Sequence, residues 1–139
     1  MKGEILALIA ALLWGIAPLF DRIVASSGVS PYVANLVRAT GAIVFLILAT
    51  IAFGFDLSAL NSKNVAYLIV AGALGGGVAM ILYYMALRFS QASRVVPITS
   101  IYPLFTVLLS SVILGERVGV KVLIGTVLIV LGVTLVCGD

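Results

Sequence analysis

The chain has 139 residues, of which 63% are hydrophobic and 9% are charged. A water-soluble domain carries about 25% charged residues, so this chain has too few polar groups to cover a surface that faces water. It has no histidine and a single cysteine, Cys137, which excludes Ser-His-Asp and Cys-His catalysis, a His-rich metal site and a disulfide framework. The formal charge of +3 forms no basic run that would bind nucleic acid. The composition therefore indicates an integral membrane protein, not an enzyme, that needs no metal or cofactor.

Charged residues divide the chain into apolar intervals long enough to cross a lipid bilayer. A membrane-spanning helix needs about 20 mostly apolar residues, and these intervals lack the alternation of a half-buried strand. They predict an all-α fold with five transmembrane helices in a single domain, residues 1–139. The helices are predicted near residues 4–23, 31–53, 64–89, 94–114 and 118–137. The first interval also has the length of a cleaved signal peptide, but Glu4 and Asp21 count against that alternative.

The cationic side chains are shared equally between the two membrane sides that five spans would create. Lys2, Lys63, Arg117 and Lys121 fall on the side of the N-terminus, and Arg22, Arg38, Arg88 and Arg94 fall on the other. An excess of Lys and Arg normally sets the cytoplasmic side, and here there is none. Two alternatives stay open: insertion in both orientations, which would supply an antiparallel homodimer, or one orientation fixed by charge position.

Arg38 is the only ionisable residue well inside a predicted span. An Arg at mid-helix costs about 2.5–3.5 kcal/mol on insertion scales and usually faces a bundle interior or a water-filled cavity. Two interpretations stay open. Arg38 either recognises an anion or carboxylate, or it is a structural residue that pairs with Asp21 or reaches back to the membrane surface.

Other polar and aromatic residues fall in the same half of the membrane as Arg38. Together they predict a vestibule that opens on the side opposite the N-terminus. Its predicted lining is Asn35, Arg38, Tyr83, Tyr84, Thr99, Ser100 and Tyr102. Helix-packing contacts, or an aromatic belt at the membrane surface, are the alternative explanation for the tyrosines.

Glycines and prolines collect near mid-depth, where interrupted helices mark the substrate site of many transporters. The predicted breaks or hinges are Pro18, Gly75, Gly76, Gly77 and Pro103. The spacing of Gly72 and Gly76 is also typical of close helix packing. Gly125 and Gly132, two turns apart on the fifth helix, predict a contact with another helix or with a second protomer.

Several motifs, taken in chain order, are similar to those of one known family. They are Trp14-Gly15 with Pro18, Arg38, Tyr83-Tyr84-x-Ala86-Leu87, Pro103, Gly115-Glu116-Arg117, and Gly125 with Gly132. With them the whole chain resembles an EamA-type domain of the drug/metabolite transporter superfamily.

The resemblance implies one half of a ten-helix inverted-repeat architecture that carries small organic metabolites. It also implies that Trp14, Arg38, Tyr83 and Tyr84 lie near a central cavity. A second unit is absent from this sequence, so a five-span unit must pair with itself in antiparallel orientation or with a homologous subunit. Met1 and the short tail at Asp139 are typical of natural ends, with half of a longer chain as the alternative.

The sequence thus predicts a multi-pass transporter of a small organic metabolite in the cell (inner, cytoplasmic) membrane. It would work as an antiparallel, dual-topology homodimer by alternating access. Arg38 favours an amino acid or organic anion as substrate, and the absence of a carboxylate at mid-span argues against proton-coupled export of cationic drugs. The alternatives are a flippase for a lipid-linked head group and a non-transporting membrane partner subunit.

Overall fold

The computed structural model describes residues 2–54 and 56–138, and its regular elements over these residues are all helices. Five helical stretches are long and apolar enough to cross a membrane. They are Gly3–Ser26, Pro31–Phe53, Ser62–Phe89, Ala92–Leu114 and Val120–Cys137. The predicted all-α fold with five spans is confirmed, and the predicted helix ends differ from the observed ones by three residues or fewer. Met1 and Asp139, the predicted ends of the domain, lie outside the described residues.

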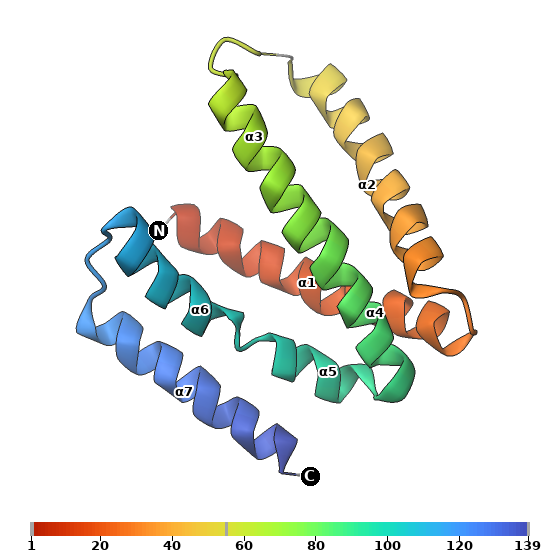
Figure 1. Cartoon of the computed structure of the whole chain (residues 1–139), viewed down its shortest axis with the longest axis vertical. Helices are drawn as coiled ribbons and strands as arrows, with labels where there is room; N and C mark the ends of the chain where they lie inside the picture. The colour runs from red at the N-terminus through yellow and green to blue at the C-terminus, as the bar shows by residue number, and fades with distance from the viewer. Residues whose placement is uncertain (1, 55, 139) are drawn as a thin grey trace. The chain divides into compact units, whose positions relative to one another are not determined.

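The helices form two compact units, Met1–Phe89 and Ser90–Asp139 (Figure 1). The first unit contains α1 (Lys2–Ser26), α2 (Pro31–Phe53), α3 (Ser62–Ala71), the π-helical segment η1 (Gly72–Val78) and α4 (Ala79–Phe89). The second unit contains α5 (Ala92–Thr99), α6 (Tyr102–Leu109), the π-helical segment η2 (Ser110–Leu114) and α7 (Val120–Cys137).

In the first unit, α4 packs against both α1 and α2, and α1 also touches α2. The apolar side chains buried there are few: Pro18, Ala25, Pro31, Ala34, Tyr84 and Leu87. Small residues such as the two alanines let membrane helices approach closely. Most of the large apolar side chains of α1 and α2 are exposed, which suits helices whose outer faces meet lipid instead of water.

In the second unit, α7 packs against α5 and α6. Val95, Thr126 and Val133 are its buried side chains. Arg94 donates from Nη2 to the carbonyl of Cys137 at 3.3 Å. A cation at this place suits the negative end of the α7 dipole and occupies one of the carbonyls left free at a helix C-terminus.

The third span departs from α-helical geometry at its run of glycines. Gly72–Val78 is π-helical, and the N–H of Ala79, the residue that follows, donates to the carbonyl of Leu74, five residues back. Glycine has no Cβ and so adapts to the wider turn. Gly75, Gly76 and Gly77, predicted as a break or hinge, therefore lie in a π-helical segment of a continuous span.

The fourth span is interrupted at Ser100 and Ile101, between α5 and α6. Pro103 has no N–H, so the carbonyl of Thr99 loses the donor that an α-helix would supply. The N–H of Leu104 donates to the carbonyl of Ile101 at 3.0 Å, three residues back instead of four. The interruption therefore lies two to three residues before Pro103.

At Pro18, predicted as a break or hinge, α1 runs through as one α-helix without an interruption. A proline inside a helix removes a single backbone hydrogen bond, and membrane helices tolerate this when the local structure adjusts.

The fourth span ends in a tight turn. The N–H of Gly115 donates to the carbonyl of Ser110, and Gly115 itself has φ of 68° in the left-handed region. A residue with a Cβ pays a free-energy cost for this conformation, so glycine is the natural choice.

We expect Gly115→Ala to lower the free energy of unfolding by about 1 kcal/mol, because of the left-handed backbone. Gly41→Ala is the control. Gly41 lies inside α2 without a left-handed φ, and a Cβ added there would have no atom within 4 Å. Thermal unfolding of the detergent-solubilised variants measures both changes. Equal destabilisation by the two substitutions would contradict this explanation of Gly115.

Candidate functional site

A buried carboxylate joins three helices of the first unit. The side chain of Asp21, on α1, is only 9% exposed. Its Oδ1 accepts a hydrogen bond of 2.5 Å from the hydroxyl of Tyr84 on α4. The same oxygen lies 3.6 Å from Nε of Arg38 on α2. The pairing of Arg38 with Asp21, one of the two interpretations of Arg38, is present in the structure.

The three side chains meet because they lie at one depth. Asp21 and Tyr84 each stand five residues before the end of their helix, and both helices run in the same direction across the membrane. Arg38 stands seven residues after the start of α2, which runs in the opposite direction. At 1.5 Å per residue all three lie about 7.5–10.5 Å from the ends of their helices on the same side of the membrane.

Arg38 keeps most of its hydrogen-bonding capacity. Its side chain is 41% exposed, and within residues 2–54 and 56–138 its terminal nitrogens have no hydrogen-bond partner. The guanidinium group is a planar fork of donors that matches a carboxylate with two parallel hydrogen bonds. Asp21 therefore pairs with the Nε edge of this group. The outer edge, formed by the two terminal nitrogens, is free to bind an anionic ligand.

The other two arginines of the first unit bind backbone carbonyls. Arg22 donates from Nη1 to the carbonyl of Leu87, and Arg88 donates from Nη2 to the carbonyl of Gly28 at 3.0 Å. Both acceptors lie at or just beyond helix C-termini, where cations are stabilising. Sequence reasoning missed these contacts, because each arginine bonds a carbonyl at the end of the other helix and not of its own.

Asn35, predicted to bind substrate, is committed to the third span. Its Nδ2 donates to the carbonyl of Gly76 at 2.9 Å and to that of Gly77 at 3.4 Å. The residue is 8% exposed. Because both contacts use the amide donors, Asn35 has none left for a substrate in this conformation.

Tyr83 lies beside the Asp21 cluster with its hydroxyl unused. The rings of Tyr83 and Tyr84 are 6.4 Å apart in an edge-to-face arrangement. The hydroxyl oxygen of Tyr83 is buried and has no hydrogen-bond partner in the described part of the chain. Burying a hydroxyl without a partner is unfavourable, so Tyr83 can bind a water molecule or a ligand group here.

The remaining predicted site residues make fewer contacts. Trp14 lies two turns before Asp21 on α1 and is exposed, and Tyr102 is an exposed residue of the second unit. A Cβ added at Gly125 or Gly132 of α7 would have no atom within 4 Å. These glycines are thus not explained by close packing within the described residues.

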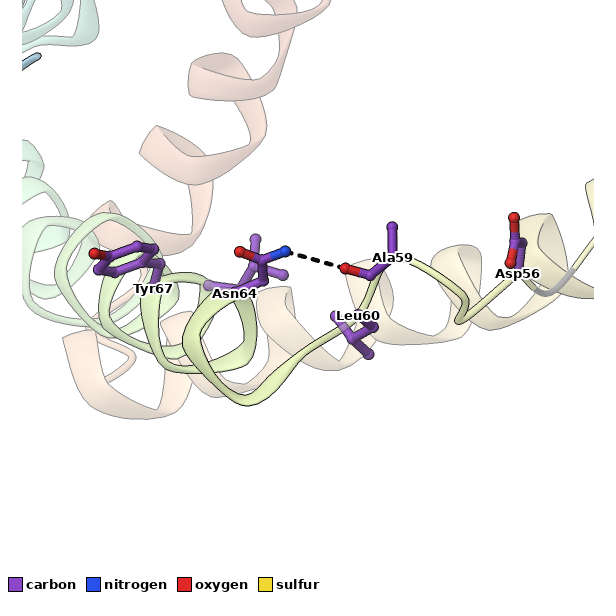
Figure 2. A pocket seen from close by; sticks show the side chains of 6 residues that line it. Asp56, Ala59, Leu60, Asn64 and Tyr67 are labelled. Atoms are coloured by element: carbon purple, nitrogen blue, oxygen red, sulfur yellow. Dashed lines mark hydrogen bonds between the residues drawn. The ribbon is translucent and has the colours of Figure 1, made fainter.

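An open pocket of about 410 Å³ lies at the other end of the first unit, where the α2–α3 loop meets the start of α3. Figure 2 shows Asp56 at one end and Tyr67 at the other, with the Asn64 amide donating to the Ala59 carbonyl at 3.1 Å between them. The backbone N–H of Ser58 donates to Asp56 at 2.8 Å and lowers the pKa of its carboxyl. This polar loop suits a membrane surface and is separate from the Asp21 cluster.

Comparison with known proteins assigns the chain to a family. The model of the EamA-like transporter family matches residues 1–138. The chain belongs to this family. It is 31% identical over 131 residues to an uncharacterized protein of Methanocaldococcus jannaschii, a match that covers 94% of this chain and 93% of that protein.

Two further relatives are longer. An uncharacterized transporter of Archaeoglobus fulgidus is 27% identical over 142 residues, and an uncharacterized protein of Pseudomonas aeruginosa is 26% identical over 136 residues. The matches cover 100% and 98% of this chain but only 49% and 46% of those proteins. The chain therefore spans about half the length of these two relatives. No solved structure gives a significant match.

The family match confirms the resemblance that the sequence motifs indicate. Together with the five apolar spans, it makes the protein a multi-pass membrane transporter. Membership of a transporter family points to a carrier and not to an enzyme.

We expect Tyr84→Phe to destabilise the first unit by about 1.5–3 kcal/mol, the usual range for a hydrogen bond to a charged group. Tyr102→Phe removes the same atom from an exposed residue whose hydroxyl has no partner among the described residues, and it should change stability little. Unfolding of the purified variants in detergent measures the difference. If the two variants were equally stable, the Tyr84–Asp21 contact would contribute nothing.

Proposed function

We propose that the protein transports a small organic metabolite with a carboxylate or similar anionic group, and that Arg38 binds this group. The observation that carries the proposal is the free outer edge of the Arg38 guanidinium beside the buried carboxylate of Asp21. An arginine placed inside a membrane span is costly, and Asp21 offsets this cost without closing off the terminal nitrogens.

The geometry of the ion pair leaves the terminal nitrogens of Arg38 available to a substrate. A direct charge-assisted hydrogen bond joins N and O atoms about 2.7–2.9 Å apart, whereas Nε of Arg38 lies 3.6 Å from Asp21. A substrate carboxylate can therefore add to the outer edge while Asp21 stays in place.

The charge of the cluster favours an amino acid over a simple anion. Asp21 and Arg38 together are neutral, so a bound anion would leave one net negative charge in a site of low dielectric constant, which is unfavourable. An amino acid carries its own ammonium group and adds no net charge. The proposed substrate class is therefore amino acids first and organic anions second.

We further propose that two copies assemble as an antiparallel homodimer inserted in both orientations. The relative from M. jannaschii is matched over 93% of its length, so the family includes a protein of about one five-span unit. The two longer relatives have room for a second unit beside the matched half. A separate second copy is inverted only if it inserts the other way up, and the equal sharing of cations permits this. The unpacked Gly125 and Gly132 on α7 are the proposed contact.

In this assembly, access to Arg38 would alternate between the two sides of the membrane as the protomers move relative to each other. Inverted pairs of units work in this way in many transporters. The proposed location is the cell membrane.

We expect Arg38→Ala to lower the uptake of amino acids or organic anions into proteoliposomes by on the order of tenfold or more, the loss that one charge-assisted hydrogen bond explains. Arg38→Lys should keep part of the activity, since it retains the charge but not the fork. The control is Arg117→Ala, which removes an exposed arginine outside the spans. Uptake by Arg38→Ala equal to that of the parent, for each substrate the parent carries, would show that Arg38 is structural.

Cys137 reports the orientation of the C-terminus, because it is exposed and is the only cysteine. In sealed vesicles that contain the parent protein, an impermeant thiol reagent should label about half of the molecules if insertion is dual. Detergent should then make the remaining thiols reactive. Labelling that is complete, or absent, before detergent is added would refute dual insertion.

A further inference from the structure

Among the described residues, the side-chain contacts of the third span with α1 and α2 lie in its second half. Three hydrogen bonds hold α4. Tyr84 donates to Asp21, Arg22 donates to the carbonyl of Leu87, and Arg88 donates to the carbonyl of Gly28. By contrast, none of the residues of α3 is buried, and α3 packs chiefly on the adjoining η1, while α4 packs on α1 and α2. Figure 1 shows α4 against α1 and the start of α2, with α3 leading away from them.

The joint between the two halves has two helical forms available to it. A π-helical turn contains more residues than an α-helical one. If η1 became α-helical, the backbone would shift by one residue relative to α4. This shift would turn α3 relative to α4 by about 100° and move it along the helix axis by about 1.5 Å. No neighbouring side chain blocks this rotation at the glycines, since a Cβ added at Gly75 or Gly76 would have no atom within 4 Å.

One side chain from another helix forms hydrogen bonds with η1. Asn35 of α2 donates to the carbonyls of Gly76 and Gly77, both within η1. In a membrane, backbone carbonyls that leave the α-helical pattern need a donor from elsewhere in the protein. Asn35 supplies such a donor to the π form that the structure shows.

We infer that Asn35 is a positioning residue that holds η1 in the π form, and that α3 turns about η1 when this hold is released. Asn35 is then a latch on the moving half of the third span and not a substrate ligand. The link to transport rests on the proposed function, because the movement of α3 would open or close the approach to Arg38 on α2. The latch itself is a statement about η1 alone.

Distances between spin labels test the latch without any substrate. In a Cys137→Ser background, labels at Phe45→Cys and Ile69→Cys report α3 relative to α2. Labels at Ile23→Cys and Phe89→Cys report the fixed half, α1 relative to α4. All four residues are exposed, so the labels do not disturb the buried contacts.

We expect Asn35→Leu to move or broaden the α2–α3 distance distribution by several ångströms and to leave the α1–α4 distribution unchanged. Thr40→Val is the matched control. It removes a polar group from the same helix, but the Thr40 hydroxyl bonds only to the Leu36 carbonyl of α2 itself. This control should leave both distributions as in the parent.

A second variant covers the case in which Asn35→Leu does not fold. Gly76→Ala leaves Asn35 in place but favours the α-helix at the joint, and it should produce a second α2–α3 distance. The latch is refuted if folded Asn35→Leu and Gly76→Ala both keep the parent distances, or if the α1–α4 distance changes equally. Loss of uptake in Asn35→Leu with unchanged distances would instead make Asn35 a substrate ligand.

The two proposals fail separately. If Arg38→Ala transports like the parent, the proposed substrate site is wrong, whereas the distances for Asn35→Leu still decide the latch. If the distances do not change, the latch is wrong, even where Arg38 proves essential for transport.

Discussion

The arrangement of the first unit depends on the carboxylate of Asp21. In the low dielectric constant of a membrane a buried charge must be paired and hydrogen-bonded, and Asp21 meets this condition through Tyr84 and Arg38. The requirement ties α1 to α2 and α4 at one depth. It also offsets the free-energy cost of placing Arg38 inside α2. The same interaction that assembles the helices therefore leaves a cationic group available for a substrate.

A second constraint is the satisfaction of backbone carbonyls. Lipid offers no hydrogen bonds, so each departure from the α-helix in a span must be satisfied from within the protein or by water. The π-helical η1 takes its extra donor from Asn35, and the turn after η2 bonds Gly115 back to Ser110. The polar residues of the spans thus serve two purposes, and the contacts separate them: Asn35 serves the backbone, whereas Arg38 keeps free donors.

The number and type of helices could be predicted from the sequence, because span length and the position of charges depend on local composition alone. Asp21 and Arg38 could also be paired, since each lies near the same membrane surface. The contact of Tyr84 with Asp21 and the role of Asn35 could not, because they depend on how helices rotate about their axes. Proline was the weakest guide: Pro103 follows a break and Pro18 lies within a continuous helix, and the sequence around each gives no measure of how neighbours compensate.

The small number of buried side chains in the first unit has a consequence for how such proteins diverge. Within this unit shape complementarity restricts only a handful of positions, and those exposed apolar residues of α1 and α2 that meet lipid need only be compatible with it. Most of the chain is then free to exchange one apolar residue for another at little cost. Relatives that share 26–31% of their residues with it can keep the same helices, and differences in cargo can arise from changes at a few polar positions while the scaffold drifts almost neutrally.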